Sequence, residues 1–150
     1  LAASRTTSHP LAAEFDRLRD YLELMAIRMG PRLRYRLDLP GDLRALPVPP
    51  LLLQPLVENA IQHGLEPQVT GGHIDVGATR EGDQLVLTVH DTGAGFEPRA
   101  ALPSDGRFGM AQLTERVASA YDGHGRVDVQ SQPGAGTTIR IALPLQGAAA

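Results

Sequence analysis

The apolar residues of this chain change their spacing several times along its length, and this alternation limits the possible folds more than any other feature. Near the start they recur every three or four positions, which predicts an amphipathic helix over residues 11–29 that stops at Gly30 and Pro31. The stripe consists of Phe15, Leu18, Leu22, Met25 and Met29. Farther along, apolar and polar residues alternate, which predicts strands with one buried face. The alternating segments are residues 33–37, 74–78, 85–89, 127–129 and 139–143.

Two more helices are predicted between these strands. The first begins at Pro49, because proline suits a first helical turn, and ends at Gly64. Pro55 lies inside it and either kinks it or marks where its regular part starts. The second covers residues 110–121. Since alternation leaves one sheet face polar, the helices should cover the other face, and we predict an α/β (α+β) two-layer sandwich.

The length of 150 residues and the hydrophobic content of 42% suit a single domain with a packed core. We expect a flexible lead-in over residues 1–10, the folded domain over residues 11–145 and a flexible tail over residues 146–150. Residues 91–106 contain several glycine and proline breaks and are expected to form a long loop, which is either functional or disordered. Because the chain begins at Leu1 and not at Met, we expect it to be a piece of a longer protein.

The composition excludes several classes of chemistry. The sequence has no cysteine, which excludes disulfides, thiolate catalysis and cysteine-ligated metals. All 14 basic residues are arginine, so the lysine of a P-loop and of Schiff-base catalysis is missing. The net charge of −3 gives no general attraction to nucleic acid or to an anionic membrane surface. No apolar run approaches the roughly 20 residues of a membrane span.

Asn59 is the only asparagine of the chain, and the predicted second helix places it on one face with Leu56, Ala60 and His63. A buried amide needs hydrogen-bond partners, so Asn59 is either a hydrogen-bonded core residue or a ligand. In the second interpretation its side-chain oxygen would bind a hard cation such as Mg²⁺, which accepts amide oxygens together with phosphate oxygens.

Asp91 ends an apolar strand and is followed by two spaced glycines, Gly93 and Gly95. Such a carboxylate either starts an ordinary turn or accepts a hydrogen bond from an exocyclic amine at the bottom of a pocket. In the second case the glycines would let the backbone approach the ligand. The run from Gly134 to Thr137 is, taken alone, a hairpin turn before the last strand.

The order and spacing of these three segments resemble the Bergerat ATP-binding fold, whose family includes sensor histidine kinases, DNA gyrase, Hsp90 and MutL. The resemblance covers nearly the whole chain. It implies a mixed sheet of about five strands with three helices on one face. The run PPLLLQPLVENAIQHG (residues 49–64) and the preceding EFDRLRDYLELMAIRMGPRL (residues 14–33) are similar to sensor histidine kinases of the LytS/AlgZ type.

This resemblance assigns expected roles to individual residues. Asn59 matches the Mg²⁺ ligand of the family, and Asp91 matches the residue that reads the adenine amino group. Gly93 and Gly95 match the edge of the adenine pocket. Thr137 matches the threonine that supports the aspartate and the adenine.

The phosphate end of the expected site departs from the family pattern. Residues 96–109 match the mobile lid over the phosphates. The family has a second glycine-rich motif in this region, and only Gly109 of this chain matches it. Arg107 would supply charge to the phosphates there instead. His63 would either touch phosphate or ribose, or cap its helix. Glu58 would be either a general base or a second-shell or surface residue, because it lies about 100° around the helix from Asn59. In hydrolytic relatives the base sits one turn before the asparagine, where this chain has Pro55.

The resemblance also implies a reaction and partners. The domain would bind ATP and Mg²⁺ and donate the γ-phosphate to a histidine on a separate dimerisation segment, from which a response regulator would receive it. That acceptor is expected upstream of Leu1, since His9 lies before a proline in the lead-in. The full-length protein is expected to be a dimeric, membrane-anchored bacterial kinase with this domain in the cytoplasm. The alternatives are a degenerate nucleotide-binding or partner-binding module without kinase activity, and a protein-serine kinase of the anti-sigma-factor type.

Overall fold

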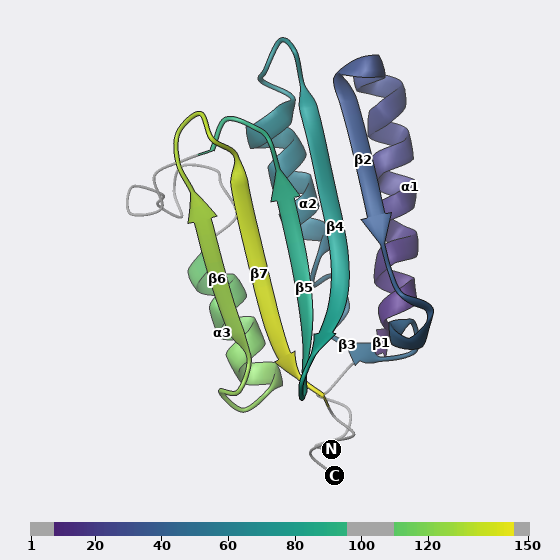
Figure 1. Ribbon diagram of the computed structural model, residues 1–150, viewed down its shortest axis with the longest axis vertical. Helices are drawn as coiled ribbons and strands as arrows, with labels where there is room; N and C mark the ends of the chain where they lie inside the picture. The colour runs from purple at the N-terminus through teal and green to yellow at the C-terminus, as the bar shows by residue number, and fades with distance from the viewer. Residues whose placement is uncertain (1–7, 96–109, 146–150) are drawn as a thin grey trace.

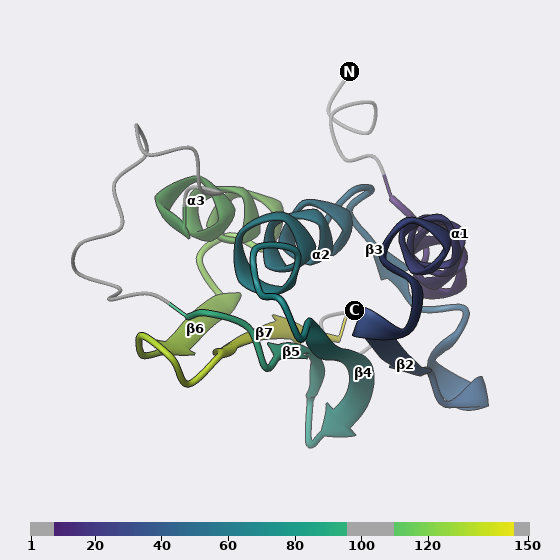
Figure 2. The same cartoon turned by 90° about the horizontal axis from the view of Figure 1, so that it is seen from above.

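The computed structural model describes residues 8–95 and 110–145 and consists of two layers. One layer is a five-stranded mixed sheet with the strand order β2-β4-β5-β7-β6, as Figure 1 shows. The other layer contains α1, α2 and α3, which lie side by side on one face of the sheet (Figure 2). The described part of the chain therefore confirms the predicted two-layer sandwich and its mixed sheet.

The helices and strands have the following bounds. The helical elements are α1 (Leu11–Met29), η2 (Gly30–Arg32), η3 (Gly41–Leu43), α2 (Gln54–Asn59), η4 (Ala60–Leu65) and α3 (Met110–Ala120). The strands are β1 (His9–Pro10), β2 (Leu33–Asp38), β3 (Pro47–Val48), β4 (Gly72–Glu81), β5 (Gln84–Asp91), β6 (Arg126–Ser131) and β7 (Thr137–Pro144). The first predicted helix has the bounds expected from its apolar stripe.

The topology brings the ends of several helices and strands together at one end of the sheet. β2 and β4 are parallel, and α2 belongs to the connection between them, whereas the other neighbouring strands are antiparallel. The register between β5 and β7 places Asp91 directly opposite Thr137. At the upper edge of the view in Figure 1, the end of β5 and the start of β7 therefore lie together near the C-terminal end of α2.

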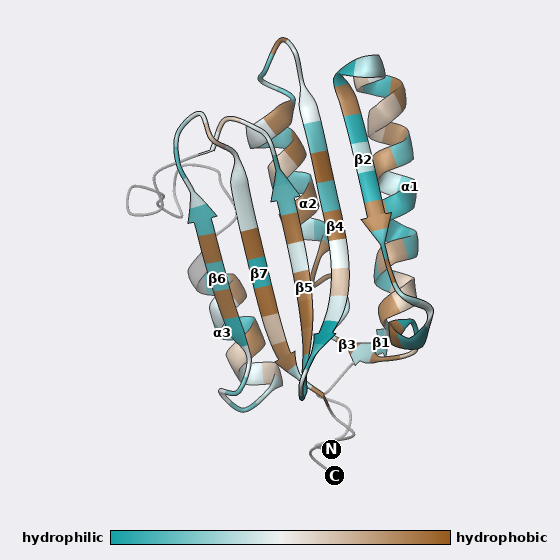
Figure 3. Cartoon of the chain, in the orientation of Figure 1, coloured by the Kyte–Doolittle hydropathy of each residue, from teal (hydrophilic) through white to brown (hydrophobic). Residues whose placement is uncertain are grey.

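The core lies between the sheet and the helices. Along β5, Leu85, Leu87 and Val89 are buried in the core cluster, and the residues between them belong to the opposite face. Figure 3 shows the alternation of hydrophobic and hydrophilic residues along the strands that this arrangement requires. The face away from the helices carries polar side chains such as Thr88 and its cross-strand neighbour Arg140. None of the described helices has both the length and the apolar character needed to cross a bilayer.

Two predicted boundaries are wrong. The second helix begins at Gln54 and not at Pro49, because residues 50–53 form a turn in which Leu51 adopts a φ of 59°. Pro55 therefore stands in the first turn of α2, where its missing N–H costs no hydrogen bond, and marks the start of the regular helix. The lead-in was expected to include His9 and Pro10, but these residues form β1 and pair with β3.

Candidate functional site

Three of the predicted motifs meet at one end of the sheet, where β5 stops and β7 starts. Asp91 ends β5, Thr137 begins β7 beside it, and the π-helical segment η4 ends at Gly64 and Leu65, where Gly64 lies next to Asp91. π-helical turns are rare in proteins, and those that occur often lie at functional sites. Segments far apart in the sequence thus build one site around the Asp91 carboxylate.

The backbone packs closely around Asp91 at two glycines. A Cβ atom added to Gly64 would lie 3.0 Å from Asp91 Oδ1. A Cβ atom on Gly93 would overlap the carbonyl group of Gly64. The Ala94 N–H donates to the Gly64 carbonyl oxygen at 2.9 Å, and the Gly93 N–H donates to Asp91 Oδ1 at 2.8 Å. The end of the helix and the strand-end loop therefore touch through backbone atoms.

Asp91 is a carboxylate that is only 4% exposed. Burial raises the pKa of the Asp91 carboxyl above its ordinary value, and the Gly93 hydrogen bond and the nearby His90 lower this pKa by less. His90 belongs to the opposite face of the sheet, where its Nδ1 lies 2.7 Å from the Thr138 hydroxyl. An ionised Asp91 is thus incompletely compensated by the protein, which suits a group that receives a hydrogen bond from a ligand.

The second glycine after Asp91 packs against the turn between β6 and β7. Gly95 has a φ of 68°, and a Cβ atom there would overlap the carbonyl oxygen of Gln132 in the turn between β6 and β7. The Gly134 N–H of that turn donates to the Ala94 carbonyl oxygen at 2.6 Å. Gly93 and Gly95 therefore allow close packing of the chain against itself, which holds residues 93–95 against Gly64 and against the turn between β6 and β7.

Thr137 lies in the wall of this site. Its side chain is buried, and its hydroxyl lies 2.7 Å from the hydroxyl of Ser131 at the end of β6. A Cβ atom on the preceding Gly136 would overlap the carbonyl oxygen of Asp91. Thr137 is consequently held beside the strand end that carries Asp91.

Asn59 and His63 lie on the helix that leads to Gly64. Asn59 is the last residue of α2, His63 lies within η4, and both side chains are half-buried and have interactions within the protein. The buried hydrophobic residues of the same helix are Leu56, Val57, Ile61 and Leu65. The structure thus brings Asn59 and His63 onto the element that ends against Asp91.

Glu58 lies in a region of the surface that is separate from the Asp91 site. Its carboxylate accepts a hydrogen bond from Gln54 Nε2 at 3.0 Å, and both residues line a groove of about 590 Å³ between α1 and α2. The α1 side of this groove is formed by Arg17, Asp20, Tyr21 and Leu24. The structure therefore separates Glu58 from the Asp91 site, which favours the surface role over that of a general base.

Some expected site residues lie outside the described part of the chain, and two others were not recognised from the sequence. Arg107, Gly109 and the predicted lid over residues 96–109 belong to the first group. Gly64 was interpreted only as the end of a helix, and Glu14 was not singled out. Glu14 has a signal in the sequence, because it follows Leu11 by three positions, and this spacing places it on the buried stripe of α1.

Within residues 8–95 and 110–145, no group of three or more histidine, cysteine, aspartate or glutamate side chains could hold a metal ion. Mg²⁺ usually keeps several waters and binds phosphate oxygens together with one or two protein oxygens, so one amide oxygen from Asn59 fits such a donor set.

Comparison with known proteins identifies the family. The model for the histidine kinase-, DNA gyrase B- and HSP90-like ATPases matches residues 50–147, and the chain belongs to this family. It is 29% identical over 134 residues to the sensor histidine kinase BtsS of Escherichia coli K12, which covers 89% of this chain and 23% of that protein. It is 33% identical over 90 residues to the sensor protein LytS of Oceanobacillus iheyensis, which covers 60% of this chain and 15% of that protein.

The fold is that of histidine kinase catalytic domains. The histidine kinase domain of the blue-light activated histidine kinase EL346 from Erythrobacter litoralis matches with a TM-score of 0.66 at 21% identity, over 91% of this chain and 61% of that one. The chain spans less than a quarter of the length of BtsS and of LytS. The predicted resemblance to the ATP-binding domains of sensor histidine kinases is thus confirmed.

The packing of Gly64 against Asp91 gives a test of the site. In Gly64→Ala, the new Cβ atom would press on the Asp91 carboxylate, while the φ of this residue suits alanine. We expect a folded protein whose affinity for ATP falls about tenfold, which corresponds to about 1.4 kcal/mol. Isothermal titration calorimetry measures the affinity. Gly41→Ala is the matched control, because a Cβ atom there has no neighbour within 4 Å, and equal ATP affinities of the two variants would contradict the assignment.

Proposed function

We propose that this chain binds ATP together with Mg²⁺ and presents the γ-phosphate to a histidine on a separate helical segment of a sensor histidine kinase. The observation that carries the proposal is the buried Asp91 carboxylate, against which the backbone of Gly64 and Gly93 packs closely. Membership of the ATPase family supports the nucleotide as the ligand.

Asp91 would recognise the adenine base. A buried carboxylate is costly unless it receives hydrogen bonds, and one comes from the Gly93 N–H. An exocyclic amino group would supply a further donor, and its hydrogen bond to a charged acceptor contributes about 1.5–3 kcal/mol. Thr137, opposite Asp91 in the sheet, would support the same base.

Asn59 would serve the phosphate end of the nucleotide. Its side-chain oxygen would hold Mg²⁺, which neutralises phosphate charge in phosphoryl transfer. His63, one residue before Gly64 and half-buried, would contact phosphate or ribose. Arg107 and Gly109 would contribute charge and backbone N–H groups to the phosphates, as proposed from the sequence.

The helix that carries Asn59 supports transfer of the γ-phosphate to a histidine and not to water, because it lacks a base in position to activate water. Water attack requires a positioned base, and the residue one turn before Asn59 is Pro55, which has no proton acceptor in its side chain. Glu58 lies in the groove toward α1. The acceptor histidine would lie on a dimerisation segment of the full-length protein, a response regulator would receive the phosphoryl group, and the whole would be a membrane-anchored bacterial kinase with this domain in the cytoplasm.

Asp91→Asn separates nucleotide binding from folding. An asparagine amide can present a donor to the adenine amine, so we expect ATP affinity to fall by one to two decades, which corresponds to about 1.5–3 kcal/mol. The raised pKa of Asp91 means that its contribution to stability is lost as pH rises from about 3.8 through the folded-state pKa. The neutral variant escapes this loss, so at pH 7 it should unfold at the same temperature or higher. Unchanged ATP affinity in the calorimeter would exclude Asp91 as the adenine reader.

Asn59→Ala tests the metal end of the site. If the amide oxygen binds Mg²⁺, the variant should lose most of the gain in ATP affinity that Mg²⁺ gives, because the metal bridges protein and phosphates. Its affinity for adenosine, which has no phosphate, should stay within about twofold, which is about 0.4 kcal/mol. Titrations of ATP with and without Mg²⁺ and of adenosine measure these affinities. Equal losses for all three ligands would make Asn59 a structural residue.

The transfer step has its own assay. With radiolabelled ATP, this chain alone should bind the nucleotide, release little phosphate and take up no label, because the nucleophile and its placement are missing. Addition of the upstream segment in the same polypeptide should produce a labelled histidine. Steady phosphate release by the chain alone would identify a hydrolytic enzyme, and binding without transfer in the longer protein would identify a degenerate module.

A further inference from the structure

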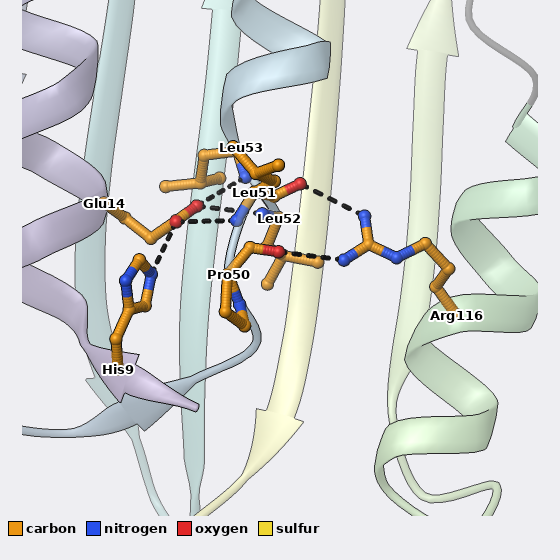
Figure 4. A network of polar contacts seen from close by, with 7 residues as sticks. All are labelled: His9, Glu14, Pro50, Leu51, Leu52, Leu53 and Arg116. Atoms are coloured by element: carbon orange, nitrogen blue, oxygen red, sulfur yellow. Dashed lines mark hydrogen bonds and ion pairs between the residues drawn. The ribbon is translucent and has the colours of Figure 1, made fainter. Parts of the chain in front are cut away.

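Glu14 is a buried carboxylate on α1 that lies well away from the Asp91 site. Its exposed fraction is 2%. Oε1 accepts hydrogen bonds from the N–H groups of Leu52 and Leu53, both at 2.9 Å. Oε2 accepts from the N–H of Leu51 at 2.9 Å and lies 2.6 Å from His9 Nε2. Figure 4 shows the carboxylate between the histidine and the backbone of this turn.

The turn that Glu14 binds is held from the opposite side by α3. Arg116 donates from Nη1 to the Leu51 carbonyl oxygen at 3.1 Å and from Nη2 to the Pro50 carbonyl oxygen at 3.0 Å. Figure 4 shows the guanidinium reaching the turn from the side away from Glu14. The N–H groups of the turn are thus bound by α1 and its carbonyl groups by α3. These contacts hold Leu51 at a positive φ of 59°, which a residue with a Cβ atom rarely adopts.

This turn fixes the start of the helix that carries Asn59. α2 follows it directly at Gln54, and α2 has no side-chain cap of its own at Leu53. The other end of the helix is fixed by the contact of Gly64 with Asp91 and Gly93. Asn59 lies six residues after Leu53, about 9 Å along the helix axis. With both ends held, the position of Asn59 along and around the axis is determined.

We propose that Glu14 is a positioning residue for the bound nucleotide: together with Arg116 it sets the position of α2 and thereby that of the Asn59 side chain. The proposal rests on the proposed role of Asn59 at the metal end of the site. The sequence separation supports a role beyond local capping, because Glu14 acts on residues 37 to 39 positions away and Arg116 on residues 65 and 66 positions away.

Two variants test the proposal independently. Glu14→Gln keeps one oxygen for Leu52 and Leu53 but turns an N–H₂ group toward the N–H of Leu51. Arg116→Gln removes the bidentate contact from an exposed position, so we expect the variant to remain folded with a small loss of stability. The matched control is Glu115→Gln. It makes the same chemical change as Glu14→Gln, at an exposed residue next to Arg116. Thermal unfolding establishes that each variant is folded at the temperature of the titrations.

Two quantities are measured for each variant. One is the gain in ATP affinity on addition of Mg²⁺, and the other is the affinity for adenosine. We expect Glu14→Gln to reduce the gain about tenfold and Arg116→Gln about threefold, with adenosine affinity unchanged within about twofold, and we expect Glu115→Gln to match the original chain. A residue that only stabilises the fold would lower the unfolding temperature and leave the gain unchanged in folded protein. If Glu14→Gln does not fold, Arg116→Gln decides the question.

The outcomes separate this proposal from the proposed function. If Asn59→Ala loses the gain but Arg116→Gln and folded Glu14→Gln keep it, the positioning proposal is wrong and the role of Asn59 stands. If Asn59→Ala itself keeps the gain, both are wrong. Equal losses for adenosine and for ATP with Mg²⁺ in the Glu14 and Arg116 variants would also overturn the positioning proposal, because they would indicate damage to the whole site.

Discussion

A buried carboxylate at the end of β5 is the constraint on which the rest of the site depends. Asp91 receives a hydrogen bond from the backbone N–H of Gly93. The helix that ends at Gly64 approaches so closely that a Cβ atom on Gly93 would overlap the Gly64 carbonyl and one on Gly64 would lie 3.0 Å from Asp91 Oδ1. Burial of a charge in such a position is unfavourable, and the protein leaves that cost in place. Gly64, Gly93 and Gly136 allow the backbone to lie close to Asp91, and the β5–β7 register places Thr137 opposite it.

Much of the fold was predictable because each element has one buried face. The apolar stripe of α1 gave its bounds, and period-two alternation located the five strands of the described sheet. Asp91 and Asn59 were recognised from residue type, position on the predicted elements and resemblance to a family. The family is confirmed by comparison, and the roles of these two residues remain proposals that rest on the geometry around them.

Features that depend on contacts between distant segments were not predictable from local pattern. The start of α2 moved from Pro49 to Gln54 because Glu14 and Arg116 hold residues 50–53 in a turn, and neither partner is near in sequence. His9 was assigned to the lead-in, yet it belongs to β1 and contacts the Glu14 carboxylate. The close approach of Gly95 to the carbonyl of Gln132 is another contact between distant segments that local pattern does not reveal.

The strand order leaves β2 and β6 as the two edges of the described sheet. Each edge carries charged side chains along its exposed positions, Arg34 and Arg36 on β2 and Arg126 and Asp128 on β6. Charged edge strands discourage the addition of a strand from another chain, since a partner would have to accommodate these charges beside its own backbone. Two copies of this domain brought close together are therefore hindered from joining their sheets through these edge strands.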